Sequence, residues 1–396
     1  MNLRFRALDA IRGIAASIVA LVHLTAAGYF FDIPIIRNGG LAVPLFFVLS
    51  GFVMAESYGQ KLDSRERLVT FFIRRFGRVY PIHFVTLLAL VVLEVIKLAL
   101  VRHGIQSGQE PFTGANSISS LIANLFLLQA IIPFGDYTWN GPTWSLSVEF
   151  YVYALFAGIT FFSVRSRAPT IIIWVISGLL LLLLEMTETR IHLTSGRGLL
   201  QCIFGFMSGV LLHRIFMKNS RLLARYATAW EVGAALLAAG IFWFAPFGDF
   251  GTILSFSAVI FVFAGDRGRI SAALQTFPLQ FLGMISLSIY LVHFVILSVL
   301  NGAIRAAQPA FKVTLMTDVN VINFGPAGLM DALAVAYLLV VIVVATLTFI
   351  FIEEPFRLYF NSVSRRQPAR YSIGAGIAQI RRLQVDCSRP TTLLRV

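Results

Sequence analysis

The stretch Leu8–Tyr29, LDAIRGIAASIVALVHLTAAGY, decides the class of fold because it is long and apolar enough to cross a lipid bilayer. Two ionisable residues, Arg12 and His23, interrupt it. A helix turns by about 100° per residue, so a spacing of eleven residues places both side chains on one stripe, about 16 Å apart along the axis. Ionisable groups inside a membrane span are costly, so this pair indicates a functional site.

The rest of the chain continues this pattern. Of its 396 residues, 58% are hydrophobic and 13% are charged. The sequence therefore predicts an all-α, polytopic membrane helix bundle of about ten transmembrane helices. The expected spans are residues 8–29, 41–58, 79–101, 143–163, 170–186, 199–213, 230–246, 251–264, 279–300 and 331–352.

The basic residues predict the orientation of this bundle. On the ten-span assignment, 25 of the 32 Lys and Arg residues lie on one side of the membrane and seven on the other. The more basic side is expected to face the cytoplasm, with both termini there, in a cell inner membrane. Because the charges lie between spans, the net charge of +13 indicates the lipid bilayer as a partner and no nucleic acid.

Two segments fall outside the ten spans. The apolar stretch Leu121–Phe134 is short, which favours a re-entrant or interfacial segment, and counting it as a span would turn the later basic loops outward. Residues 1–360 are predicted to form the membrane domain. Residues 361–396, with seven arginines and one aspartate, are expected to be a poorly ordered cytoplasmic tail that can touch anionic headgroups.

Polar residues at similar depth suggest a second member of the first-span site. Glu149 lies about as far from the outer end of the fourth span as His23 lies from the outer end of the first. A carboxylate at that depth needs a partner, and a neutral histidine needs a fixed tautomer. We therefore expect Glu149 to orient His23. Ser147, in the same polar helix opening, is a possible supporting residue or a helix cap.

A second polar group lies at the cytoplasmic side. Arg75 and Arg78 are three residues apart on one helical face, and paired guanidinium groups suit phosphates, including those of coenzyme A. Arginines beside a span also serve topology and lipid headgroups, and the spacing alone leaves that reading open. Asp9 and the pair Glu353 and Glu354 are the candidates to neutralise these arginines or Arg12.

Two weaker features complete the set. Tyr290 and His293 lie one turn apart on one face of the ninth span. This spacing is compatible with a packing role and with a catalytic role. The small Ser50-Gly51 step permits close approach of two helices. The sequence has no zinc-ligand cluster, Gly-rich nucleotide loop or nucleophile elbow, so no metal site is predicted.

Taken together and in order, these motifs resemble membrane-bound acyltransferase family 3, which includes O-antigen, peptidoglycan and Nod-factor O-acyltransferases. The matching motifs are Leu8-Asp9-Ala-Ile-Arg12-Gly13 with His23, Phe46-Phe47-Val-Leu-Ser50-Gly51-Phe52, Arg75-x-x-Arg78 with Tyr80-Pro81, Trp144-Ser-Leu-Ser147-Val-Glu149, Tyr290-Leu-Val-His293 and Glu354-Pro355. The resemblance implies transfer of an acyl group, with acetyl expected, from acyl-CoA to a hydroxyl of a carbohydrate, glycolipid or related acceptor. It associates activity with the two polar residues of the first span and with the paired arginines. It implies acyl-CoA as a donor substrate and no permanently bound cofactor.

The placement of these residues suggests a mechanism. Arg75, Arg78 and Arg12 would hold the anionic CoA at the cytoplasmic mouth while the pantetheine arm carries the thioester into the bundle. His23, oriented by Glu149, would act as general base on an acceptor hydroxyl that arrives from the outer side, or would itself take the acyl group. Glu354, before Pro355, is a possible supporting residue.

Two functions of other classes compete with this reading. A secondary transporter could use buried Arg, His and Glu as a substrate or proton pathway, but it would be expected to show inverted repeats and interrupted helices in two halves, which the sequence does not show. A structural membrane scaffold would leave Arg12, His23 and Glu149 unexplained.

The charge distribution gives a testable topology. Reporter fusions at Gly59, Arg221 and Arg370 should report the cytoplasm, and fusions at Asn38 and Glu188 should report the outer side. Paired phosphatase and fluorescent-protein reporters at each position would measure this. An outward-facing tail would contradict the ten-span assignment and the placement of residues 121–134.

Overall fold

The fold is known from a computed structural model, which describes residues 4–59, 61–103, 110–134, 137–163, 166–187, 196–245, 247–311, 315–316, 321–368 and 371–388. The fusion positions Glu188 and Arg370 lie outside the described residues, as do residues 389–396 of the tail.

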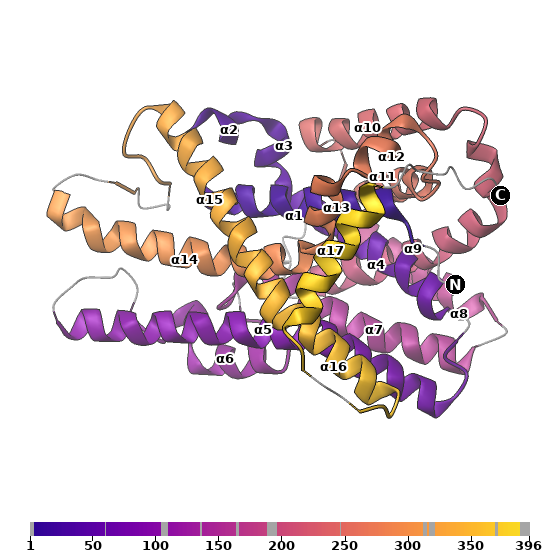
Figure 1. Ribbon diagram of the computed structural model, residues 1–396, viewed down its shortest axis with the longest axis horizontal. Helices are drawn as coiled ribbons and strands as arrows, with labels where there is room; N and C mark the ends of the chain where they lie inside the picture. The colour runs from indigo at the N-terminus through magenta and orange to yellow at the C-terminus, as the bar shows by residue number, and fades with distance from the viewer. Residues whose placement is uncertain are drawn as a thin grey trace.

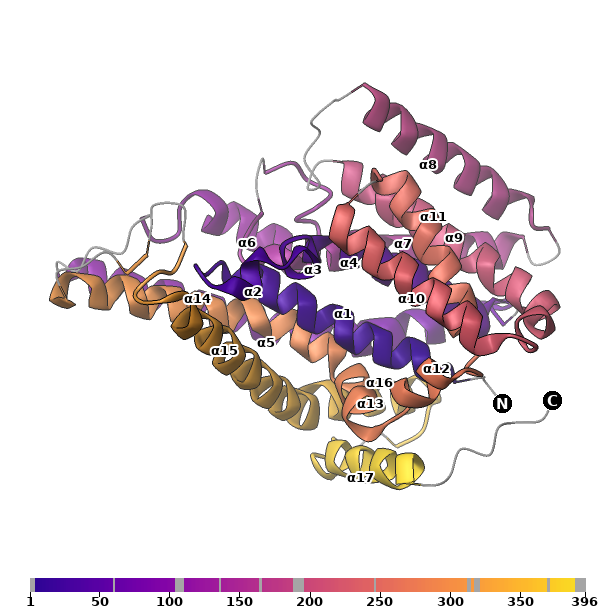
Figure 2. The same ribbon diagram turned by 90° about the horizontal axis from the view of Figure 1, so that it is seen from above.

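The described residues form a bundle of helices (Figures 1 and 2). The long helices are α1 (Arg6–Leu24), α4 (Ala42–Tyr58), α5 (Arg65–Arg102), α7 (Trp144–Phe162), α8 (Ala168–Met186), α9 (Gly198–Asn219), α10 (Ala227–Phe244), α11 (Asp249–Phe263), α14 (Ser286–Phe311) and α15 (Ala327–Thr348). Shorter helices are α2 (Tyr29–Asp32), α3 (Pro34–Arg37), η1 (Gly39–Leu41), η2 (Gly114–Asn116), α6 (Ile118–Leu125), η3 (Gly141–Thr143), η5 (Ser220–Leu223), α12 (Arg269–Leu274), α13 (Phe277–Met284), the π-helix η6 (Phe349–Glu353), α16 (Glu354–Ser364) and α17 (Gly374–Ser388).

The all-α, polytopic prediction is confirmed. Among the described residues, nine helices are long and apolar enough to cross a membrane, and α11 is a shorter apolar helix of 15 residues. Together they coincide with the ten expected spans. Some boundaries differ. The expected span 279–300 is divided at Ile285, between the end of α13 and the start of α14, and the first helix ends at Leu24 instead of residue 29.

The third span is much longer than expected. Helix α5 has 38 residues, about 57 Å at about 1.5 Å per residue, and begins at Ser64, whose side chain accepts a hydrogen bond from the backbone N–H of Arg67. Arg75 and Arg78 were expected in a loop before this span, but they lie inside the continuous helix. Helix α14 runs beside α5 (Figure 1).

The segment 121–134 does not qualify as a span, as the sequence predicted. Its helix α6 has only eight residues, and turns follow it. Two side chains tie this segment to the bundle. His83 Nε2 donates to the carbonyl of Asn124 at 2.9 Å, and Ser147 donates to the carbonyl of Leu127.

The tail is not without structure in its described part, in contrast to the expectation for residues 361–396. Helix α16 continues to Ser364, and α17 packs against α13, α16 and the π-helix. Leu383 of α17 is buried, and Gly376 allows close approach, since a Cβ there would lie 2.6 Å from Ile350 Cα. The sequence did not predict α17 because this helix docks through few apolar residues and so contains no long apolar run.

The start of α1 is held by a carboxylate from the loop before α12. Asp266 accepts hydrogen bonds from the backbone N–H groups of Arg6 and Ala7, both at 2.8 Å. Burial raises the pKa of Asp266 to about 6, and the two hydrogen bonds oppose that rise. A negative side chain at a helix N-terminus is favourable. This contact fixes the helix that carries Arg12 and His23.

Helices α4 and α9 approach each other through glycines. A Cβ on Gly51 would lie 1.9 Å from the carbonyl oxygen of Phe206, and a Cβ on Gly209 would lie 2.0 Å from that of Val48. The sequence-based expectation of close packing at Ser50-Gly51 is therefore confirmed.

This contact predicts that Gly209→Ala destabilises the fold, because its methyl group would force the two backbones apart at a cost of about 1–3 kcal/mol. Gly233, on α10, is the control because a Cβ added there would meet open space. Gly233→Ala should therefore leave the stability of the fold unchanged or raise it by about 0.5–1 kcal/mol. Thermal unfolding of both variants in detergent would measure the difference. Equal melting temperatures would contradict the assigned packing.

Candidate functional site

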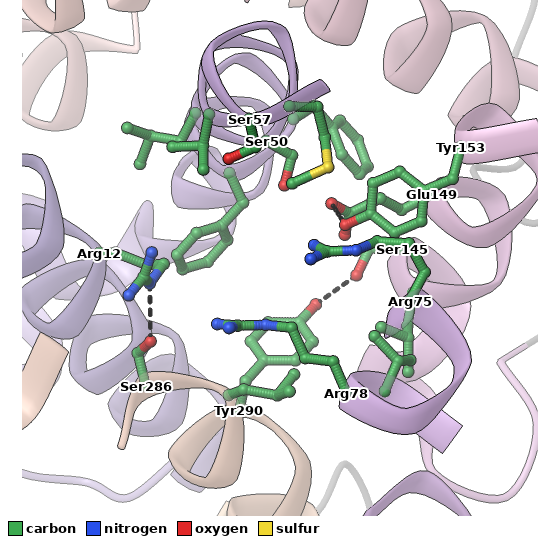
Figure 3. Close-up of a pocket in the computed structure, with 18 of the residues that line it drawn as sticks. Arg12, Ser50, Ser57, Arg75, Arg78, Ser145, Glu149, Tyr153, Ser286 and Tyr290 are labelled. Carbon is green, nitrogen blue, oxygen red and sulfur yellow. Dashed lines mark hydrogen bonds between the residues drawn. The ribbon is translucent and has the colours of Figure 1, made fainter. Parts of the chain in front are cut away.

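A cavity of about 330 Å³ lies between α1, α4, α5, α7 and α14 (Figure 3). Its wall is apolar where phenylalanine, leucine and valine side chains line it, and polar elsewhere. The polar lining residues are Asp9, Arg12, Ser50, Ser57, Arg75, Arg78, Ser145, Glu149, Tyr153, Ser286 and Tyr290.

Three guanidinium groups from two helices point into this cavity (Figure 3). Arg12 donates to Ser286 Oγ at 2.9 Å and to the Asp9 carboxylate at 3.1 Å, so Asp9 is the partner of Arg12. Arg75 and Arg78 line the same cavity, as their spacing predicted. The guanidinium of Arg75 lies 5.5 Å from the ring centroid of Tyr58.

Arg78 differs from the other two arginines. Among the described residues it has no hydrogen-bonded partner, although its side chain reaches the cavity. Its attractive electrostatic partner is the carboxylate of Glu353, with which it forms no hydrogen bond, so the rigid donor fork of Arg78 remains open to an anion in the cavity.

Glu149 lies on the opposite wall. Its carboxylate accepts a hydrogen bond of 2.5 Å from Tyr153, one turn further along α7, and it faces the side chain of Arg75 (Figure 3). The cavity therefore combines guanidinium groups with two carboxylates, Asp9 beside Arg12 and Glu149 facing Arg75, and with hydroxyl groups (Figure 3).

His23 lies elsewhere, against α14. Its Nδ1 is 2.7 Å from the carbonyl oxygen of Val19, and its ring centroid is 5.1 Å from that of His293. The predicted contact between His23 and Glu149 is wrong, since among the described residues neither side chain contacts the other. The depth estimate assumed that the fourth span starts at the outer surface. Instead Ser145, near the start of α7, contacts Tyr290, and Glu149 one turn further on lines the cavity with Arg12, while α14 packs against His23.

The shared stripe of Arg12 and His23 is confirmed by their partners. Arg12 contacts Ser286 at the start of α14, and His23 contacts His293 two turns later. The two helices therefore run side by side in the same direction, and both side chains of α1 face α14.

Tyr290 and His293 connect the cavity to His23. The hydroxyl of Tyr290 lines the cavity and is 2.7 Å from Ser145 Oγ, while its ring centroid is 5.9 Å from that of His293. His293 is fully buried with its Nδ1 3.2 Å from the carbonyl oxygen of Ile289. Its Nε2 has no partner among the described residues. The order from the cavity outward is Tyr290, His293, His23.

Two of the predicted supporting residues lie outside this cavity. Ser147 bonds to the carbonyl of Leu127 and so fastens the segment after α6. Glu354 forms two hydrogen bonds with Arg357, at 2.6 and 2.7 Å. Glu353, its neighbour on the π-helix, accepts a hydrogen bond of 2.7 Å from Ser288. A π-helical turn is frequent at functional sites.

Sequence reasoning missed Ser50, Ser145, Tyr153 and Ser286 as members of the site. Isolated hydroxyl groups are common in membrane helices and carry no spacing signal, so only the packing of the helices identifies them.

A second cavity of about 630 Å³ adjoins the first and shares Asp9, Arg12 and Arg78 with it. It lies between α1, the π-helix, α16 and α17. Within the described part of the chain, no group of three His, Cys, Asp or Glu residues could hold a metal ion.

Comparison with known proteins identifies the family of this chain. A family model described as an acyltransferase domain matches residues 5–353. Acyltransferase MdmB of Streptomyces mycarofaciens is 33% identical over 39% of this chain and 38% of its own length. Protein 2 in the picA locus of Rhizobium radiobacter is 36% identical over 39% of this chain and 81% of its own length. The chain thus spans less than half of the Streptomyces protein, and no solved structure matches it. The family model covers most of the chain, and we conclude that the protein belongs to the membrane-bound acyltransferase family that this model describes.

Proposed function

We propose that the protein is a membrane-bound O-acyltransferase that moves an acyl group, with acetyl expected, from acyl-CoA to a hydroxyl of a carbohydrate or related acceptor. The observation that carries this proposal is the convergence of Arg12, Arg75 and Arg78 on one cavity inside an acyltransferase domain. A phosphorylated donor fits a cavity whose lining combines several guanidinium groups with hydroxyl groups.

The donor enters from the cytoplasm in this proposal, across a cell inner membrane. The second cavity shares Arg12 and Arg78 with the first, and the loops at that end of the bundle are the basic ones. The positive-inside tendency assigns that end to the cytoplasm, where acyl-CoA is made.

His23 is the general base of the proposed transfer. A carbonyl oxygen only accepts hydrogen bonds, so the contact with Val19 requires the proton of neutral His23 to be on Nδ1 and leaves a lone pair on Nε2. Nε2 takes the proton of the acceptor hydroxyl as its oxygen attacks the thioester carbon. The carbon–sulfur bond then breaks, and the thiolate leaves with the proton from His23, which regenerates the base.

The position of His23 beyond Tyr290 and His293 sets a condition on this step. The thioester must extend from the cavity past Tyr290 to reach the base, and His293 lies directly beside the reacting pair. Glu149 has a different role from the one expected from depth. Its carboxylate accepts a hydrogen bond from Tyr153 and faces Arg75, and in this proposal it positions that guanidinium for the donor.

The first prediction for this mechanism concerns donor binding. Arg78→Ala should weaken acetyl-CoA binding about 10- to 100-fold, because a charge-assisted hydrogen bond to phosphate is lost, and Arg78→Lys should recover only part. Arg74 is a matched control on the same helix, since it bonds to Ser364 and lines neither cavity. Binding can be measured by calorimetry on purified protein in nanodiscs. If Arg78→Ala binds acetyl-CoA as tightly as Arg74→Ala, Arg78 serves topology only.

The second prediction concerns chemistry. His23→Ala should bind acetyl-CoA normally, because His23 does not line the cavity, but should lose transfer by about 10²- to 10⁴-fold. His103→Ala, at the exposed end of α5, is the control and should transfer as the parent does. The assay follows radiolabelled acetyl from acetyl-CoA into a glycan or membrane fraction.

Two results would decide against parts of this proposal. Full transfer by His23→Ala would remove the catalytic assignment of that residue. A parent protein that moves no acetyl group to any of a broad panel of acceptors, but moves solutes across vesicles, would favour the secondary transporter instead.

A further inference from the structure

The second cavity has a feature that the proposed function does not use, namely its lining by the last described helix. Residues Ala375, Ala378, Gln379, Arg382, Leu383 and Asp386 of α17 form one of its walls. The family model ends at residue 353, so this wall lies outside the matched acyltransferase domain.

Guanidinium groups dominate the polar lining of this cavity. They belong to Arg4, Arg12, Arg78, Arg357 and Arg382, which come from four helices or their ends. The carboxylates in the same cavity are those of Asp9, Glu353, Glu354 and Asp386.

Most of these carboxylates already form a hydrogen bond or an ion pair within the protein. Asp9 bonds to both Arg4 and Arg12, and Glu354 bonds to Arg357. Glu353 accepts the hydroxyl of Ser288. Among the described residues, Arg78 and Arg382 line the cavity without a hydrogen bond or ion pair.

Helix α17 is firmly docked where it forms this wall. Gly376 lies against the backbone of Ile350, Leu383 is 3% exposed, and Gln379 accepts a hydrogen bond of 3.2 Å from Arg357. Arg382 immediately precedes the buried Leu383, so its side chain starts from a fixed backbone.

We propose that this cavity binds the phosphorylated nucleotide end of the acyl donor, with Arg382 of α17 contacting its 3′-phosphate. The inference rests on the proposed function and extends it, because it assigns donor recognition to a segment beyond the acyltransferase domain. Arg78, at the junction of the two cavities, then lies beside the diphosphate, and the pantetheine arm passes it into the first cavity. The first cavity, about 330 Å³, takes the narrow arm and the thioester, and the second, about 630 Å³, takes the bulkier nucleotide.

The test compares two neighbouring arginines and two donors. Arg382→Ala should weaken acetyl-CoA binding by about tenfold, as expected for the loss of one phosphate contact. Arg382→Glu should weaken it further, because it reverses the charge at that contact. Arg381 is the matched control, because it is also exposed on α17 but lines neither cavity. Arg381→Ala should bind acetyl-CoA as the parent does.

The second donor isolates the phosphate. Acetyl-dephospho-CoA lacks the 3′-phosphate, so the parent and Arg382→Ala should bind it with equal affinity. In the transfer assay, Arg382→Ala should raise KM for acetyl-CoA and leave kcat unchanged. An equal loss with both donors, or no loss with either, would overturn the assignment of Arg382 to that phosphate.

A lipid headgroup is another source of phosphate at this position. The binding measurements are therefore made in nanodiscs of phosphatidylcholine alone and of phosphatidylcholine with phosphatidylglycerol. The tenfold loss should appear in both, whereas a loss found only with the anionic lipid would assign Arg382 to headgroups and overturn the inference. A parent protein that binds no acetyl-CoA in either disc would contradict the proposed function itself. Tight binding by the parent and by Arg382→Ala alike would contradict only this inference.

Discussion

The cost of placing cations inside an apolar helix bundle organises this structure. A guanidinium group in such surroundings is stable only where partners or a polar cavity surround it. Arg12 meets this requirement through Asp9, Ser286 and the backbone of Gly283. Arg75 and Arg78 meet it at the wall of the same cavity, opposite Glu149. The helices that carry these groups must therefore keep their relative rotation, because turning any one of them would move a charge into the apolar core or the lipid.

The sequence predicted the parts of the fold that depend on length and period. Nine of the ten expected spans correspond to one long helix each, and the span 279–300 corresponds to α13 and α14. Residues 121–134 do not qualify as a span, since crossing a bilayer demands about twenty apolar residues. Helical period likewise predicted that Arg12 and His23 share a stripe and that Arg75 and Arg78 share a face. The pairing of Asp9 with Arg12 was among the candidates for the same reason, because residues three apart on a helix are neighbours.

The predictions that were wrong concern the arrangement of the helices relative to one another. Depth was counted from the expected ends of the spans, and the count could not reveal that Glu149 lies in the cavity with Arg12 while α14 packs against His23. The hydroxyl groups of Ser145, Ser286 and Tyr153 were missed for the same reason, since their importance comes only from the cavity that they line. Helix α17 was missed because its docking uses a glycine contact and one buried leucine, neither of which produces an apolar run.

The π-helical turn at Phe349–Glu353 makes the last helix sensitive to its length as well as to its side chains. It lets consecutive carboxylates serve different partners, with Glu353 against Ser288 of α14 and Glu354 against Arg357. Each residue of a helix adds a rotation of about 100°, so deleting one residue from this turn would rotate all of α16 by that angle relative to α15. Deleting Ile350, Phe351 or Ile352, which do not line the second cavity, would carry Arg357 away from it. Homologous chains should therefore tolerate substitutions in this turn more readily than insertions or deletions.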